Sequence, residues 1–193
     1  MPGERECEGA VRTLIRHFAD DATREGLRDT PRRVVEAWTH WTSGYLQDPG
    51  EVLKCFEDGA ENYDTLVTVG NLSFFSLCEH HLAPFWGRAY VGYIPRGRIV
   101  GLSKIARVVE IFARRLQVQE RMTRQIADTL QEHLNPLAVG VCLRARHSCM
   151  ESRGVQKVGA VTTTSALTGE FKTDAAARAE FLRFTECTWG DAL

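Results

Sequence analysis

"LAVGVCLRARHSC", residues 137–149, is the stretch that decides the fold. Apolar side chains occupy every second position from Val139 to Ala145, and this period of two is typical of a β-strand with one buried face. If the alternation continues, His147 and Cys149 lie on the same side of the strand as the buried residues. The sequence therefore predicts a strand that ends in two potential metal ligands.

The segments on either side of this strand complete a sheet. We expect strands over 64–77, 85–95 and 157–169, and helices over 103–116, 119–134 and 174–185. In chain order the elements are two strands, two helices, two strands and a last helix. This order predicts a four-stranded antiparallel sheet with two helices on one face, which is an α+β fold.

Residues 1–60 are expected to form an N-terminal helical segment in front of one functional unit over residues 61–193. A first helix is predicted over 6–19. A second begins at Thr30-Pro31, where we expect the Thr30 hydroxyl to cap the helix and the proline to occupy its first turn. Apolar residues at helical spacing then predict a packed face, made by Val34, Val35, Trp38, Trp41 and Tyr45.

The composition limits the classes of function. A net charge of -1 over 193 residues gives no positive field that would favour nucleic acid as a partner. The N-terminal residues show no apolar core of a secretory signal, and no run reaches the roughly 18 apolar residues of a membrane span. Six scattered cysteines do not suggest a disulfide framework. We expect a cytoplasmic protein without a membrane partner, in which clustered Cys and His bind metal.

A second cluster of metal-ligand types is "CEHH", residues 78–81. Cys78 and His81 are three residues apart, so a tight turn can direct both at one point. Cys149 offers a third ligand, whereas Cys142 has the opposite parity in its strand. Three protein ligands leave one coordination position of Zn²⁺ open, which is the catalytic arrangement. A closed structural zinc site, or simply packed Cys and His, remains an alternative.

Two further histidines, His80 and His147, lie beside these ligands in the sequence. An open zinc site lowers the pKa of a bound water toward ~7, and a neighbouring imidazole is suited to proton transfer. The residues therefore predict a hydrolytic site in which one or both of these histidines transfer protons.

Phosphate recognition is suggested by "GLSKIAR", residues 101–107. We expect Ser103 to cap a helix, with Lys104 and Arg107 on its first turn, and such a helix start binds phosphate well. Arg153 lies four residues after Cys149 and could approach the same pocket. The alternative is an amphipathic helix with ordinary surface charges.

Gln119 and Glu120 lie at the predicted junction of two helices. A carboxylate there could accept the paired N–H groups of guanine. An acidic residue that merely complements the helix dipole is the alternative.

These motifs resemble the GTP cyclohydrolase I family along nearly the whole chain. The resemblance is carried by "EGLRDTPRRV", "CEHHLAPFWG", "VGYIP", "GLSKIAR", "QVQERMTRQIA", "RHSCMESRGV" and "TTTSALTGEF". It implies a tunnelling fold (T-fold) behind an N-terminal helical segment. It also implies a homo-oligomer, a decamer of two pentameric rings with active sites at subunit interfaces.

The resemblance implies a role for each candidate residue. Zinc would be bound by Cys78, His81 and Cys149, and protons would be transferred by His80 and His147. Which histidine is the acid and which the base stays open.

The substrate-binding residues follow in the same way. Glu120 would recognise guanine, with Gln119 beside it. The triphosphate would be held by Ser103, Lys104, Arg107 and Arg153. Arg33 would reach the site of a neighbouring subunit.

The implied reaction converts GTP and water to 7,8-dihydroneopterin triphosphate and formate. Hydrolysis would open the imidazole ring, expel C8 as formate, and be followed by rearrangement of the ribose carbons. The alternative function is a zinc-binding relative that is non-catalytic or acts on another nucleotide.

Overall fold

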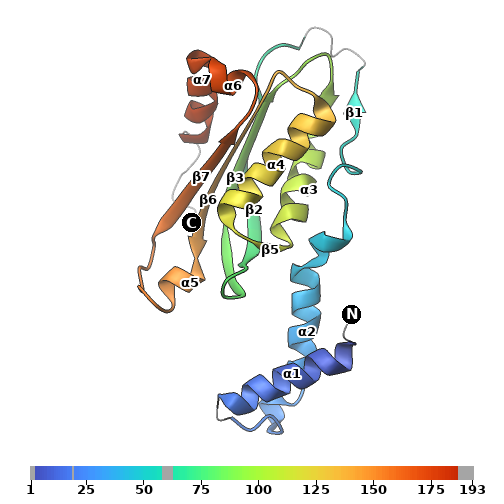
Figure 1. Cartoon of the computed structure of the whole chain (residues 1–193), viewed down its shortest axis with the longest axis vertical. Coiled ribbons are helices and arrows are strands. Elements are labelled where there is room, and N and C mark those ends of the chain that lie inside the picture. Colours follow the sequence, from blue (N-terminus) through green and yellow to red (C-terminus); the bar gives the residue numbers. More distant parts are fainter. Residues whose placement is uncertain (1–2, 19, 58–62, 187–193) are drawn as a thin grey trace. The chain divides into compact units, whose positions relative to one another are not determined.

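The structure, a computed structural model, describes residues 3–18, 20–57 and 63–186 (Figure 1). The chain divides into two compact units, Met1–Ser43 and Gly44–Leu193. The predicted boundary at residue 60 lies outside the described residues and stays a prediction. Within the described residues, no helix combines the length and the apolar character that crossing a bilayer requires.

The N-terminal unit contains two packed helices, α1 (Glu4–His17) and α2 (Thr30–Trp41), with a short 3-10 turn η1 (Glu25–Leu27) between them. The helix α2 begins where the sequence predicts and has proline in its first turn. However, Asp29 occupies the N-cap position. The Thr30 hydroxyl donates backwards to the Gly26 carbonyl at 3.4 Å, so the prediction that it caps the helix is wrong.

The aromatic residues of the predicted packed face are exposed in this chain. Trp38 and Trp41 keep 38% and 39% of their surface, and Tyr45, in the turn η2 (Ser43–Leu46), keeps 57%. Val34 and Val35 are half-buried. The prediction of a packed face is therefore wrong for the three aromatic rings.

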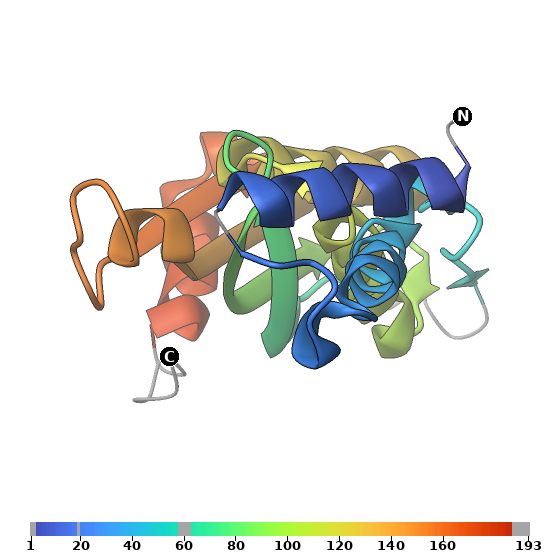
Figure 2. The same cartoon turned by 90° about the horizontal axis from the view of Figure 1, so that it is seen from below.

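The main sheet has five strands in the order β5-β2-β3-β6-β7 (Figure 1). Their bounds are β2 (Val67–Cys78), β3 (Ala83–Ile94), β5 (Leu116–Gln117), β6 (Ala138–His147) and β7 (Val161–Leu167). The four long strands pair antiparallel, whereas β5 pairs in parallel with the end of β2. The sheet is thus mixed, and a four-stranded antiparallel description omits β5. Figure 2, which looks along the strands, shows that the sheet is curled.

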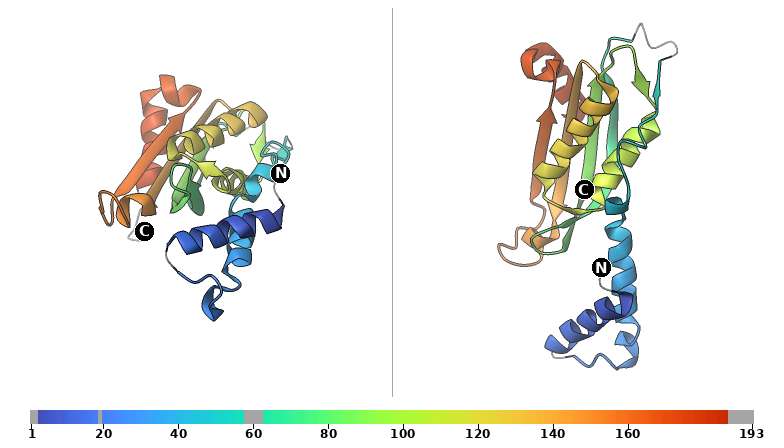
Figure 3. Two further views of the ribbon diagram at one scale, coloured as in Figure 1. Left: turned by 60° about the horizontal axis from the view of Figure 1, so that its bottom comes forward. Right: turned by 45° about the vertical axis from the view of Figure 1, so that its right-hand side comes forward.

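Helices cover both faces of the sheet, and the apolar core is larger on one face than on the other (Figures 1 and 3). The helices α3 (Leu102–Ala113) and α4 (Gln119–Leu134) pack on one face and enclose the larger apolar core. On the other face, α6 (Glu170–Thr173) and α7 (Ala175–Glu186) cover a smaller cluster. A separate two-stranded sheet joins β1 (Cys55–Phe56) to β4 (Ile99–Val100).

The strand β6 has the alternation that the sequence predicts. Its residues Val139, Val141, Leu143 and Ala145 are buried in the core under α3 and α4. Cys142 is buried in the cluster on the opposite face, as its parity predicts. The stretch that decides the fold is therefore a central strand with both faces covered.

The strand β2 contains a bulge. Between Val69 and Leu72, two residues of β2, Gly70 and Asn71, lie opposite the single residue Tyr90 of β3. Asn71 has a φ of 56°, a left-handed conformation that asparagine tolerates better than most residues. A Cβ on Gly70 would lie 2.5 Å from the Tyr90 ring, so any larger residue there would displace the ring.

The bulge changes which side chains of β2 face the core. Before it, Val67 and Val69 pack against the core under α3 and α4; after it, Leu72, Phe74 and Cys78 do so. The inward positions are odd-numbered before the bulge and even-numbered after it, because one extra residue interrupts the period of two. Cys78 consequently ends β2 on the face covered by α3 and α4.

Candidate functional site

The first part of the site is the tight turn between β2 and β3. Cys78 is buried at the end of β2, and its carbonyl accepts the backbone N–H groups of His81 at 3.3 Å and Leu82 at 2.8 Å. Leu82 closes the turn with a φ of 50°. This geometry turns the His81 ring back over the strand end, with Nδ1 3.8 Å from the Cys78 sulfur.

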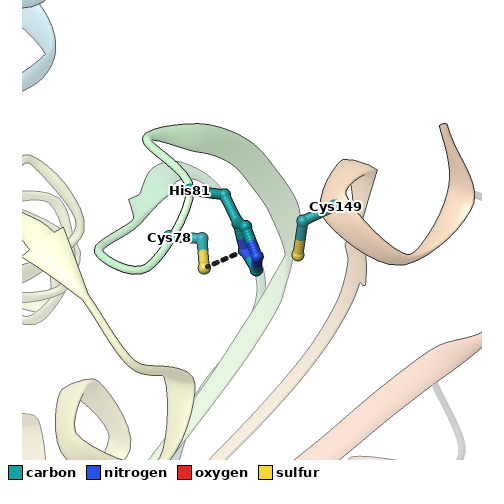
Figure 4. Close-up of side chains that lie close together, drawn as sticks. All are labelled: Cys78, His81 and Cys149. Carbon is teal, nitrogen blue, oxygen red and sulfur yellow. Dashed lines mark hydrogen bonds between the residues drawn. The ribbon is translucent and has the colours of Figure 1, made fainter. Parts of the chain in front are cut away.

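Cys149 completes the group from the other side (Figure 4). The strand β6 stops at His147, and Cys149 lies on the short helix α5 (Ser148–Glu151) rather than on an extended strand. The Ser148 hydroxyl donates to the Pro84 carbonyl at 2.6 Å and ties α5 to β3. One helical turn thus brings Cys149 to the ligands, so the predicted partner is right although the predicted strand is too long.

The three side chains form a set that could hold a metal ion. The ligand atoms of Cys78, His81 and Cys149 all lie within 4.8 Å of one another. Two ligand atoms on tetrahedral zinc are about 3.6 Å apart, given typical Zn–S and Zn–N distances, close to the 3.8 Å between sulfur and Nδ1. Burial, with the nearby Cys78 sulfur, raises the pKa of the Cys149 thiol. A bound divalent cation would offset this rise in pKa because it stabilises coordinated thiolates.

Arg153 contacts the same imidazole. Its Nη1 lies 3.0 Å from Nε2 of His81. A guanidinium can only donate, so Nε2 is the acceptor in this contact. The structure therefore brings Arg153 to the candidate metal ligands, as the sequence spacing suggests.

Gln119 determines the tautomer of His147. Its amide nitrogen lies 3.2 Å from the Leu143 carbonyl, 3.0 Å from the Thr162 carbonyl and 3.1 Å from the Thr164 hydroxyl. Two carbonyls only accept, so this atom is the donating nitrogen and the amide oxygen is an acceptor. That oxygen lies 2.8 Å from Nε2 of His147. His147 therefore carries its proton on Nε2, and Nδ1 is the free nitrogen of the neutral ring.

The His147 ring is also fixed by stacking. It lies on the buried Phe85 ring with 4.6 Å between centroids and 4° between planes. Burial lowers the pKa of His147, and the Glu120 carboxylate partly opposes this shift. The side chain is thus held in one orientation and favours the neutral form.

Glu120 and His80 are the exposed members at this end of the sheet. Glu120 lies on the first turn of α4, and His80 lies on the turn after β2 with its Nε2 3.9 Å from Glu79. Glu79 also forms an ion pair with Arg121 of α4. The hydrogen bond from Arg121 lowers the pKa of the Glu79 carboxyl and joins the two elements. Sequence reasoning missed Arg121, although it directly follows Glu120.

The predicted phosphate residues of α3 lie elsewhere in the same chain. The helix starts at Leu102 with Gly101 at the N-cap, so the prediction that Ser103 caps it is wrong. The Val100 N–H donates to the Tyr93 hydroxyl at 3.3 Å, which holds the start of α3 beside the far end of β3.

The other end of α3 leads into β5, beside Cys78. Along the helix, Ser103 and Ala113 are about 15 Å apart at 1.5 Å per residue. Ser103 and Lys104 therefore lie away from the metal ligands of their own chain, and Arg107 lies one turn nearer. Arg33 belongs to the N-terminal unit, where its guanidinium is 3.4 Å from Asp29. Its part in the site stays a prediction.

Comparison with known proteins gives a consistent family. The family model for GTP cyclohydrolase I matches residues 7–186. The GTP cyclohydrolase 1 of Janthinobacterium sp. (strain Marseille) is 60% identical over 171 residues, which cover 89% of this chain and 86% of that protein. The GTP cyclohydrolase 1 of Nitrosospira multiformis is 57% identical over 178 residues, covering 92% and 93%. That of Wolinella succinogenes is 52% identical over 176 residues, covering 91% and 93%.

Among solved structures, the crystal structure of the archaeosine synthase QueF-Like in the apo form matches with a TM-score of 0.46 and 19% sequence identity. The match covers 54% of this chain and 93% of that chain.

Proposed function

The chain belongs to the GTP cyclohydrolase I family of enzymes, and on this premise we propose that it converts GTP and water to 7,8-dihydroneopterin triphosphate and formate. The observation that carries the proposal is the group of Cys78, His81 and Cys149 at the end of the sheet. His147 and Glu120 lie at the same end.

We propose that Cys78, His81 and Cys149 hold Zn²⁺. Two sulfurs and one imidazole nitrogen form a donor set typical of catalytic zinc sites. When bound, zinc supplies Lewis acidity that activates water for hydrolysis near neutral pH. The roles of the remaining residues follow from this chain's own contacts.

His147 is the better defined of the two proton-transfer groups. The Gln119 amide oxygen accepts a hydrogen bond from the Nε2–H group, so Nδ1 is the atom that can exchange a proton with the substrate. His80 is 65% exposed, and its Nδ1 and Nε2 make only long contacts, 3.9 Å to the Cys78 sulfur and 3.9 Å to Glu79, so it is held less firmly than His147. We assign Nδ1 of His147 as the proton acceptor of the resting site and leave His80 as the second group.

Base recognition is assigned to Glu120. Its carboxylate is exposed at the start of α4 and can accept two N–H groups of guanine. The neighbouring Gln119 is only 2% exposed and its amide is already occupied by four polar contacts. We propose that the Gln119 side chain orients His147 rather than contacting the guanine.

Triphosphate binding is proposed to involve more than one copy of the chain. Arg153 lies at the metal ligands, but Ser103 and Lys104 are near the far end of their own sheet. A site that uses all three needs α3 of a neighbouring chain. The same applies to Arg33 if it serves another subunit, as the family resemblance implies.

The proposed assembly is the T-fold decamer of two pentameric rings. The four long antiparallel strands with α3 and α4 on one face agree with the T-fold pattern. Among the described strands, β7 is at a sheet edge, and edges of this length are usually covered by pairing. Exposed rings such as Trp38 and Trp41 are typical of surfaces buried by association.

Incubation of the purified chain with GTP and zinc tests the function. The proposal predicts equimolar formate and a pterin with its absorbance and fluorescence. A ring-opened formamide without formate would mean that the reaction stops after the first hydrolysis. Unchanged GTP at full zinc occupancy would overturn the proposal in favour of a non-catalytic zinc protein.

A further inference from the structure

The segment between β6 and β7 carries two proposed site residues but has little apolar anchoring. Cys149 lies on α5, and Arg153 follows it. Side chains over residues 152–159 are exposed, so no hydrophobic core holds this segment. Its position must therefore come from polar contacts.

One carboxylate ties both ends of the segment. Glu151 accepts two parallel hydrogen bonds from Arg146, each 2.7 Å long, and one from the Gly159 N–H at 3.2 Å. Arg146 lies on β6 before the segment, and Gly159 lies two residues before β7. We name this arrangement the Arg146–Glu151 clasp.

The clasp has the geometry of a strong ion pair. Bidentate contact between a guanidinium and a carboxylate fixes the relative orientation as well as the distance. The two side chains are only 25% and 11% exposed, so water screens the pair less than an ordinary surface pair. The Arg146 guanidinium also lies 5.7 Å from the Trp86 ring centroid, opposite it in the sheet.

Arg146 of the clasp lies on the face of the sheet away from α3 and α4, whereas the candidate site lies on the face that these helices cover. Arg146 has the parity of Cys142, which faces away from α3 and α4, whereas His147 has the parity of the core residues. Glu151 is two residues from Cys149 and two from Arg153. Fixing Glu151 therefore limits the movement of both.

We propose that Arg146 and Glu151 are positioning residues that hold Cys149 at the metal ligands and Arg153 at the phosphate-binding side. The inference rests on the proposed function and adds two residues that contact neither metal nor substrate. It predicts that breaking the clasp weakens metal affinity and substrate affinity while the fold persists.

The test measures zinc affinity of the purified full chain by competition with a chromophoric chelator. Glu151→Gln keeps the shape but turns one acceptor oxygen into a donor, so it cannot receive both guanidinium bonds. Loss of an outer support of a metal ligand typically weakens affinity about 10- to 100-fold, and we expect about 10-fold. Asp128→Asn is the matched control, because it makes the same change in the exposed Arg124–Asp128 pair. It should leave zinc affinity within about twofold, as expected for an exposed pair.

A double variant distinguishes two causes of weaker zinc binding: loss of the positioning contact and the presence of an unpaired buried charge. Arg146→Met with Glu151→Leu removes both charges, so neither remains unpaired. If the pair positions the ligands, the double variant stays as weak for zinc as Glu151→Gln. Recovery of wild-type zinc affinity in the double variant would overturn the inference.

Two further measurements keep this inference distinct from the proposed function. Amide hydrogen exchange over residues 148–160 should be faster in Glu151→Gln, and KM for GTP at saturating zinc should rise more than kcat falls. A wild-type chain that binds zinc but leaves GTP unchanged would overturn the proposed function alone. Unchanged zinc affinity and exchange in Glu151→Gln would overturn the clasp alone.

Discussion

Replacing Gln119 by methionine, alongside a matched control, should show how far the amide orients His147 and how far it stabilises the fold. Methionine has a similar length but no amide, so the His147 Nε2–H loses its acceptor. The amide oxygen makes one bond, and the two hydrogens of the nitrogen serve three nearby acceptors. Three hydrogen bonds at roughly 0.5–1.5 kcal/mol each suggest a loss of about 2–4 kcal/mol in the free energy of unfolding.

Gln117→Met is a matched control two residues away. Gln117 is equally buried and also makes three side-chain hydrogen bonds, to Phe112, Gln125 and Arg121, but none to a histidine. Both variants should lower Tm by a similar amount, on the order of 5–10 °C. Only the Gln119 variant should change the His147 tautomer.

The assay combines steady-state turnover with ¹⁵N spectra of labelled histidine. General acid–base groups contribute about 10²–10⁴ in rate, and His147 is retained, so we expect kcat to fall about 10- to 100-fold in Gln119→Met with little change in KM. The His147 signals should change from a single tautomer to a mixture. Equal kcat values in the two variants, with His147 still protonated at Nε2, would refute the assignment of Gln119.

The remaining predictions concern the metal, the base and the shared site. Cys149→Ser should lose both zinc and turnover, measured by metal analysis and the formate assay, and full activity in a verified zinc-free sample would contradict the catalytic metal. Glu120→Gln should reduce GTP turnover at least about tenfold with zinc still bound, because a charge-assisted pair is worth about 1.5–3 kcal/mol; unchanged turnover would leave Glu120 as a helix-start charge. Arg33→Ala should be nearly inactive, yet reassembly with equal amounts of Cys149→Ser should restore roughly a quarter of wild-type activity if Arg33 serves a neighbour. No activity in verified hetero-oligomers would show that it does not.

The proximity of Cys78, His81 and Cys149 could be predicted from sequence because local spacing and strand alternation determine it. The i, i+3 spacing of Cys78 and His81 needs only a tight turn, and parity in β6 is reliable up to His147. Extending that parity past the strand end predicts Cys149 on the same side, and in the structure a helical turn brings it there. The predicted proximity of Cys149 to Cys78 and His81 is confirmed because an extended strand and a helical turn would both bring Cys149 to the same side of the sheet.

The parts that sequence reasoning missed depend on contacts distant in the chain. The bonds of Gln119 reach residues 24 to 45 positions away, which no local pattern encodes. The strand β5 has two residues and exists only because the end of β2 is beside it. Ser103 looks like a helix cap by type, but the backbone is already helical at Leu102. Residue type suggests a cap, whereas the position of the helix start depends on packing.

The bulge in β2 has a consequence for comparing chains of different length. Removing Asn71 would leave Gly70 alone opposite Tyr90 and restore strict alternation from Val69 to Leu72, with the later register unchanged. Removing a residue after Leu72 would instead turn every later side chain of the strand, Cys78 included, to the other face. A one-residue gap in an alignment of this strand therefore belongs at positions 70–71. If the gap is placed later, between Leu72 and Cys78, the alignment pairs residues that face the core with residues that face away from it.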